Sequence, residues 1–222
     1  GEMCAEIGLE YRDQVVYATS RLDRIAAAAH VDIPEGESLN MVDSPDYFTA
    51  MASASHLLDK DIVSTEHGAT FGATMGAYAY TNEMAIRQAN RVIPGGVNQY
   101  IMHYYTYNDL DYPDTPEALW PGFSAMGSFF SEPWRDNSPT WENVDIMTNY
   151  LARVGYFMRQ GLVKRDVVVY KQSYWYPRHV RLFWVDEAMQ DAGYTYDFIS
   201  DGLLGYDAAV VTDDVLAADT AG

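Results

Sequence analysis

Acidic side chains stand where predicted strands end. Glu35 and Glu37 directly follow the short predicted strand 31–33, and Glu66 directly follows the predicted strand 62–65. The carboxyl ends of neighbouring parallel strands meet at one edge, so these carboxylates are expected to share one cleft. Two carboxylates across a cleft are the minimum for cleaving a glycosidic bond, one as acid and the other as base or nucleophile. Glu66 is the main candidate and the choice between Glu35 and Glu37 is open, although strand-end glutamates of an acidic chain also occur as plain solvent-facing residues.

Further polar candidates lie on other predicted strands. His103 ends one of them and suits substrate binding, metal ligation or a structural hydrogen bond. Asp197 lies inside the last predicted strand, 194–200. His56 and His67 do not have the spacing of a metal pair, and His56 falls within a predicted helix, where packing or a local hydrogen bond is expected.

A long segment without periodicity, residues 106–139, interrupts the pattern. Loops of this length in a compact domain are usually functional. Three tryptophans lie in or beside it: Trp120, Trp134 and Trp141. They could stack on sugar rings or anchor the loop itself.

Five predicted strands, separated by four helices, would position these residues. The strands are 31–33 (stopped by Pro34), 62–65, 97–105, 166–170 and 194–200. The helices are 44–60, 81–93, 140–161 and 183–192, after an Ala-rich helix at 22–29. Ser44, Thr81 and Thr140 are expected to cap three of them, and the Val-rich strand 166–170 is expected to be covered on both faces.

Alternation of strands and helices is typical of parallel α/β structure. An open doubly wound sheet usually carries a phosphate-binding glycine fingerprint, and the glycines at 68, 72 and 76 have the wrong spacing for one. We therefore predict the C-terminal portion of a (β/α)8 TIM-type barrel with about five parallel strands. Residues 1–222 are interpreted as one partial catalytic domain, with the loop excursion at 106–139.

The composition excludes several classes of protein. The 222 residues carry a formal charge of −18, whereas nucleic acids and anionic membranes require clustered Lys and Arg. No run approaches the roughly 18 apolar residues of a membrane span. Cys4 is the single cysteine, so an internal disulfide and a cysteine-based zinc site are both excluded. The first residues show no signal peptide, and the chain is interpreted as a piece of a longer protein.

An ordered set of segments resembles the catalytic barrel of glycoside hydrolase family 106, the α-L-rhamnosidases. The resemblance covers most of the chain, and it rests on the order and spacing of the set. The segments are Ile33-Pro34-Glu35-Gly36-Glu37, Ala52-Ser53-Ala54-Ser55-His56-Leu57-Leu58, Ile62-Val63-Ser64-Thr65-Glu66, Gly96-Val97-Asn98-Gln99-Tyr100-Ile101-Met102-His103, 150–161, 166–170 and 192–197.

The resemblance implies an inverting hydrolase that removes terminal α-L-rhamnosyl residues from plant or microbial glycans. Its glutamates would correspond to Glu66 and to Glu35 or Glu37. Its substrate-binding residues are expected at Asn98, His103, Trp141 and Asp197. A calcium ion at the sugar hydroxyls is also implied, with its ligands unknown, and the acidic loops supply oxygen ligands in excess.

The expected partner is therefore a rhamnose-containing oligosaccharide or polysaccharide, and the expected location is secreted or periplasmic. Two other functions stay open at this point. One is a glycosidase of the same barrel type with another sugar specificity. The other is a barrel fragment that binds carbohydrate without catalysis.

Overall fold

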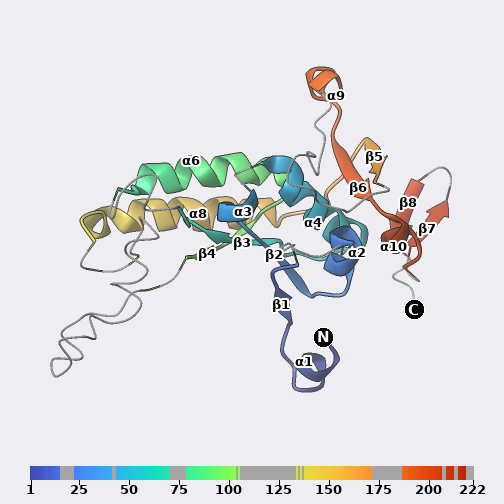
Figure 1. The fold of residues 1–222 in the computed structure, drawn as a ribbon, viewed down its shortest axis with the longest axis horizontal. Coiled ribbons are helices and arrows are strands. Elements are labelled where there is room, and N and C mark those ends of the chain that lie inside the picture. The colour runs from blue at the N-terminus through green and yellow to red at the C-terminus, as the bar shows by residue number, and fades with distance from the viewer. Residues whose placement is uncertain are drawn as a thin grey trace.

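The computed structural model gives the chain an α/β fold with a parallel sheet and alternating helices (Figure 1). The residues that the structure describes are 1–15, 23–41, 44–70, 79–103, 105, 134, 136, 138–171, 187–206, 209–212 and 215–218. Most of the predicted loop at 106–139, Trp120 included, lies outside these residues.

Four strands form the main sheet. They are β1 (Arg12–Asp13), β2 (Ile33–Glu37), β3 (Ser64–His67) and β4 (Gln99–Met102), all parallel and adjacent in sequence order. The main helices between and after them are α2 (Arg24–Ala29), α4 (Pro45–Leu57), α6 (Asn82–Val92) and α8 (Val144–Met158). The predicted order of strands and helices is thus confirmed for this part of the chain.

The remaining elements are short. They are α1 (Glu2–Glu6), α3 (Ser38–Met41), the 3₁₀ turns η1 (Ile93–Gly95) and η3 (Trp141–Asn143), β5 (Val167–Tyr170), α9 (Glu187–Asp191), β6 (Tyr196–Ile199), α10 (Asp201–Leu204), β7 (Ala209–Thr212) and β8 (Val215–Ala218). Strands β5 and β6 pair in parallel as a separate sheet, and β7 and β8 pair antiparallel. The five predicted strands therefore do not form one continuous sheet among the described residues.

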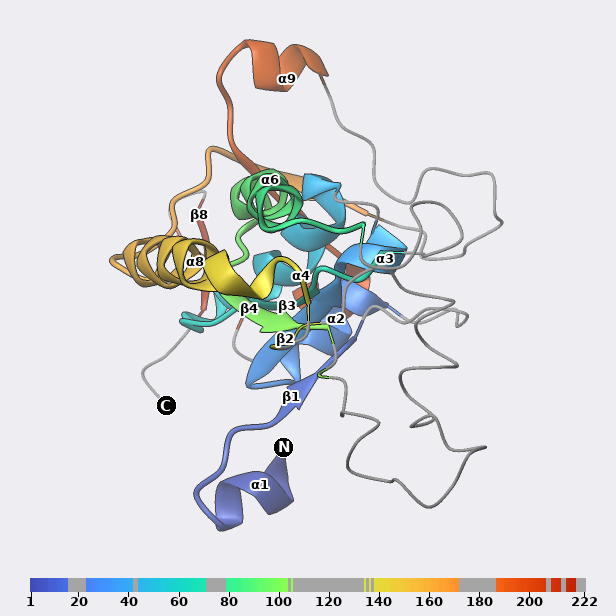
Figure 2. The same cartoon turned by 90° about the vertical axis from the view of Figure 1, so that its left-hand side faces the viewer.

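The two faces of the main sheet differ in chemistry because successive side chains of a strand point to opposite sides. Helices α4, α6 and α8 lie on one side of β2–β4 (Figures 1 and 2). On that side His67 is fully buried, and its Nε2 lies 2.9 Å from the Ala85 carbonyl of α6. The other face presents Glu35, Ser64 and Glu66.

Helix α4 is the centre of the packing. Most of its residues are buried, and it contacts α2, β2, η1 and β6. Small residues permit this close packing: a Cβ on Gly95 of η1 would lie 2.6 Å from the Pro45 carbonyl oxygen and 2.7 Å from the Phe48 Cβ. The helix begins after Ser44, as predicted, but Ser44 makes no capping hydrogen bond with its side chain.

The other two predicted caps have different outcomes. Thr81 accepts a hydrogen bond from the Met84 amide, which confirms it as the cap of α6. Thr140 instead precedes the 3₁₀ turn η3 and caps no helix with its side chain. Of the apolar side chains of α8, Met147 and Leu151 are buried, whereas Phe157 is 75% exposed.

A single lysine closes the end of α2. Lys60 donates from Nζ to the carbonyl oxygens of Ala28, Ala29 and Val31 at 3.3, 2.7 and 2.6 Å. Carbonyls of a last helical turn have no partner within the helix, so a cation there stabilises them. Burial lowers the pKa of Lys60 below its ordinary value, while the nearby Asp32 carboxylate opposes that change.

Two strand predictions were wrong. Strand β2 continues through Pro34 to Glu37. Ile33 donates its amide to Tyr11 on the β1 side, so the nitrogen of Pro34 faces the β3 side, before the first paired residue of β3. The missing N–H of Pro34 therefore removes no hydrogen bond between the strands. Strand β5 is not covered on both faces, since Val168 and Tyr170 are 46% and 50% exposed.

Candidate active site

Strand register brings the predicted glutamates together. Glu35 pairs with Ser64 across β2 and β3, and Glu37 pairs with Glu66. Side chains two residues apart share a face, so all three glutamates project from the same face of the sheet. They lie within β2 and β3 and do not follow the strands, which corrects the predicted boundaries without moving the residues to another end of the sheet.

Glu35 is buried and held by three partners. The Ser64 hydroxyl donates to its Oε2 at 2.8 Å, and the Gln14 amide donates to its Oε1 at 3.2 Å. The Arg12 guanidinium Nε lies 3.3 Å from Oε2. Only 6% of Glu35 is exposed, so a nearby cation and two donors compensate the charge that burial would otherwise penalise.

Glu66 is the more accessible carboxylate. Its side chain is 27% exposed, and it accepts a hydrogen bond from Gln14 Nε2 at 2.5 Å. The His103 Nε2, directly after β4, lies 3.9 Å from Glu66 Oε1. Glu37, directly opposite Glu66 in the register, is only 2% exposed. Glu66 is therefore the carboxylate of this group that solvent or a substrate reaches most readily.

We call this group, Arg12, Gln14, Glu35, Ser64, Glu66 and His103, the carboxylate cluster. It places one solvent-accessible carboxylate beside a second that is fixed by a cation. The first can give or take a proton, while the second supplies a fixed negative charge next to it. Arg12 and Ser64 begin β1 and β3, whereas Gln14, Glu66 and His103 lie near or just after the carboxyl ends of β1, β3 and β4. These three residues therefore lie at the edge where parallel α/β enzymes carry their active sites.

Asn98 does not join the carboxylate cluster. It is 7% exposed, its Oδ1 accepts the Val63 amide at 3.0 Å, and its Nδ2 donates to the Asp61 carbonyl at 2.7 Å. Both partners precede β3, at the opposite end from Glu66. The predicted substrate contact is replaced here by a structural one that ties the starts of β3 and β4 together.

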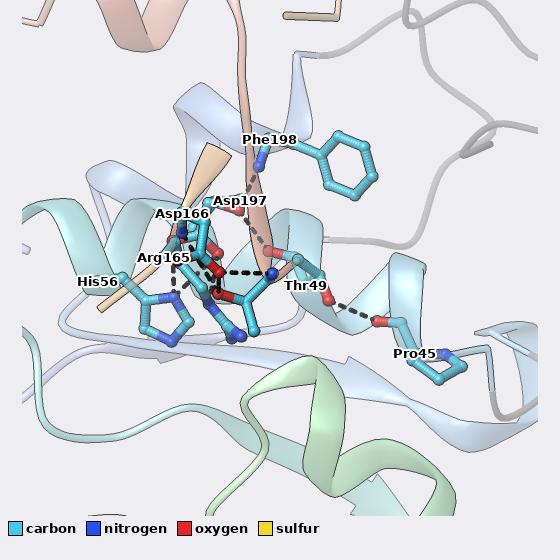
Figure 3. A network of polar contacts seen from close by, with 9 residues as sticks. Pro45, Thr49, His56, Arg165, Asp166, Asp197 and Phe198 are labelled. Atoms are coloured by element: carbon cyan, nitrogen blue, oxygen red, sulfur yellow. Dashed lines mark hydrogen bonds and ion pairs between the residues drawn. The ribbon is translucent and has the colours of Figure 1, made fainter. Parts of the chain in front are cut away.

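Asp197 also lies elsewhere. It belongs to β6, where His56 Nδ1 of α4 lies 3.0 Å from both of its carboxylate oxygens and Arg165 Nε lies 3.3 Å from Oδ1 (Figure 3). In the same network the Ser53 hydroxyl of α4 accepts the Phe198 amide at 2.8 Å. His56 therefore makes a structural hydrogen bond, but the partner is 141 residues away in the sequence and not local as predicted, and the bond gives Asp197 a bracing contact with α4.

The described tryptophans pack in different ways. Trp134 is buried, meets Tyr80 edge to face at 5.9 Å between ring centroids, and covers Gly68 just after β3. A Cβ at Gly68 would lie 2.7 Å from its ring, so glycine is required for this contact. Trp141 is half-buried in η3, which directly precedes α8. The proposed stacking wall is thus not seen among the described residues.

Three members of the cluster were not predicted: Arg12, Gln14 and Ser64. A signal for them exists in the sequence, because Arg12 and Gln14, like Ser64 and Glu66, are spaced by two and share a strand face. The two-residue strand β1 is too short to be recognised from its own periodicity.

The calcium ion that the family resemblance implies would need several oxygen ligands from the protein. Among the described residues there is no group of three or more His, Cys, Asp or Glu side chains that could hold a metal. The carboxylates of the cluster are already bound by Arg12, Gln14 and Ser64. These residues alone therefore do not fit a calcium site, and a site would need ligands from other parts of the protein.

A parallel α/β fold with carboxylates on neighbouring strands matches the general class of glycoside hydrolases. The chain belongs to glycoside hydrolase family 106, the α-L-rhamnosidase family, whose sequence profile matches residues 6–221. No curated protein sequence matches it.

The fold is similar to that of a solved rhamnosidase from Novosphingobium sp. PP1Y, with a TM-score of 0.68 and 18% sequence identity. That match covers 98% of this chain and 20% of the rhamnosidase, so the chain spans about a fifth of that protein's length. Within the residues that have been placed, no helix is long and apolar enough for a bilayer crossing.

Proposed function

We propose that the protein containing this chain is a glycoside hydrolase that removes terminal α-L-rhamnosyl residues from glycans, with Glu66 as the group that transfers a proton. The observation that carries the proposal is the carboxylate cluster, found in a chain of the α-L-rhamnosidase family. Glu66 combines accessibility with only one close donor. Glu35 is more buried and more fully bound, which favours a fixed electrostatic role for it.

The spacing of the cluster bears on the stereochemistry. Glu35 Oε1 and Glu66 Oε2 lie 3.2 and 2.5 Å from the same nitrogen of Gln14, so they are closer together than the sum of these distances. Inverting glycosidases hold their two carboxyl groups about 6.5–9.5 Å apart to admit a water molecule. Inversion, which the family resemblance implies, therefore requires a second catalytic carboxylate outside this pair.

Family membership also supports a proposal for the domain around the carboxylate cluster. The polar face of β1–β4 would line the inside of a (β/α)8 barrel that other strands of the protein complete. Rhamnose is a neutral deoxy sugar, so its hydroxyls would meet the cluster while aromatic side chains contact its methyl group and ring face. Calcium, with ligands mostly outside the described residues, and a secreted or periplasmic location complete the proposal.

The direct test is Glu66→Gln in the protein that contains this chain. We expect kcat on an aryl α-L-rhamnoside to fall at least about a thousandfold, in the range for loss of a general acid or base. Glu83→Gln, on an exposed side chain of α6, is the matched control and should leave kcat unchanged. Full turnover by the Glu66 variant would end this assignment, and activity of the wild type only on other aryl glycosides would redirect the specificity.

A further inference from the structure

The carboxylate cluster contains an amide that joins its two carboxylates. Gln14 follows β1, and its Nε2 donates to Glu66 Oε2 at 2.5 Å and to Glu35 Oε1 at 3.2 Å. A side-chain amide has two N–H donors on one nitrogen, so it can serve one oxygen of each carboxylate. Two carboxylates so close would otherwise repel each other.

We propose that Gln14 is a positioning residue of this site, which clamps Glu35 and Glu66 into one unit and fixes the orientation of Glu66; this inference rests on the proposed function. Glu35 is the fixed end of the clamp, because Arg12 and Ser64 hold its other oxygen at 3.3 and 2.8 Å. Glu66 is the free end, with one carboxylate oxygen directed to Gln14 and the other toward His103. Gln14 thereby fixes the position of the Glu66 carboxylate relative to the immobilised carboxylate of Glu35.

The charges that face the clamp come from all four strands. Arg12 on β1 is the cation, Glu35 and Glu37 on β2 and Glu66 on β3 are the acids, and His103 follows β4. An acidic group in place of the amide would add a further like charge to this set. It would also replace the shared donor by an acceptor, unless the new carboxyl group is protonated.

Two variants separate hydrogen-bond donation at position 14 from the size of the side chain. Gln14→Glu keeps the shape of the side chain and donates only at acid pH, whereas Gln14→Met keeps approximate size and never donates. On an aryl α-L-rhamnoside we expect kcat to fall about 30- to 100-fold in both, with KM changed less than threefold, because a misoriented catalytic group costs on this scale. Gln160→Met, on an exposed side chain directly after α8, is the matched control and should retain wild-type kcat.

Thermal melting gives a readout that does not depend on activity. The loss in Tm for Gln14→Glu should be at least twice as large at pH 7 as at about pH 4, where a protonated carboxyl again donates through its one O–H to one of the two carboxylates. Because Glu adds a like charge in any case, Gln14→Met gives the deciding comparison. In Gln14→Met a side chain that merely fills space would give equal losses at both pH values, whereas loss of the clamp leaves Glu35 and Glu66 to repel each other more at pH 7 than at pH 4. If Gln14→Glu fails to fold at neutral pH, Gln14→Met supplies kcat and its own pair of Tm values.

The outcomes separate this inference from the proposed function. Wild-type activity that disappears in Glu66→Gln but survives unchanged in both Gln14 variants, with a pH-independent loss in Tm for Gln14→Met, would overturn the clamp alone. No rhamnosidase activity in the wild type, together with a pH-dependent loss in Tm for Gln14→Met, would overturn the proposed function and leave the clamp supported.

Discussion

Asp197→Asn tests whether Asp197 braces the fold or binds substrate. The side chains of Asp197, His56 and Arg165 are only 13%, 8% and 19% exposed, so the change removes a negative charge that faces two partly buried basic groups. Asparagine keeps an oxygen acceptor, which leaves part of each hydrogen bond in place. Charged hydrogen bonds contribute about 1.5–3 kcal/mol and broken buried pairs cost more, so we expect a loss of about 2–3 kcal/mol.

Such a loss should be local to the junction between α4 and β6. Since about 1.4 kcal/mol corresponds to a factor of ten, amide hydrogen exchange in residues 45–57 and 196–199 should accelerate about 30- to 150-fold. KM for an aryl rhamnoside should not change. Asp191→Asn, on an exposed side chain at the end of α9, provides the control.

A different pair of results would refute the bracing role. If KM rose tenfold or more while hydrogen exchange in both segments stayed at the wild-type rate, Asp197 would act on the substrate. The double variant with His56→Ala sharpens the test, because two residues that stabilise the fold through each other give a non-additive loss.

Of three other predictions, two follow from the described residues and the third, on calcium, follows from the proposed function. Burial lowers the pKa of His67 from 6.5 to about 4, so its contribution to stability is full above pH 6.5 and is lost as pH falls toward 4. In His67→Phe the free energy of unfolding should therefore fall less between pH 6.5 and 4 than in the wild type. The same pH dependence in both proteins would contradict this. Gly155→Ala should cost about 1–3 kcal/mol by denaturant unfolding, because the new Cβ would lie 2.5 Å from the Asn98 carbonyl oxygen, whereas Gly161→Asn, at a positive φ with open space, should cost far less. Treatment with EDTA should lower rhamnosidase activity, and calcium should restore it better than magnesium because calcium accepts irregular oxygen sites; full activity of a preparation shown to be metal-free would exclude the ion.

The order of elements was predictable because local signals agree with the final packing. Thr81 before α6 and Pro45 at the start of α4 mark helix starts by their own chemistry. The shared face of Glu35 and Glu66 was also predictable in outline, because it depends only on parallel neighbours. The limits of the strands were not predictable, because β2 can include Pro34 only where β3 does not yet pair with it.

The roles of individual polar residues were less accessible to sequence reasoning. Asn98 and Asp197 have the functional groups expected of a sugar site, but long-range contacts with Val63 and His56 bind them to the framework. Gln14 lacks an acidic or basic group and follows a two-residue strand, so its spacing of two from Arg12 is too short a pattern to distinguish it. Gln14 and Glu66 are 52 residues apart in the sequence, and only the folded sheet brings their side chains together.

Lys60 donates three hydrogen bonds to backbone carbonyls, so the chemical reactivity of its amine can report whether this part of the chain is folded. The sequence contains only three lysines, at positions 60, 164 and 171. Acylating reagents attack the free, unprotonated amine, and Lys60 has its Nζ directed at three carbonyl oxygens beneath the end of α2. Acylation at this one position would therefore record the separation of α2 from α4, and the modified fraction, read by mass spectrometry, would follow that event through synthesis, heating or storage without an introduced label.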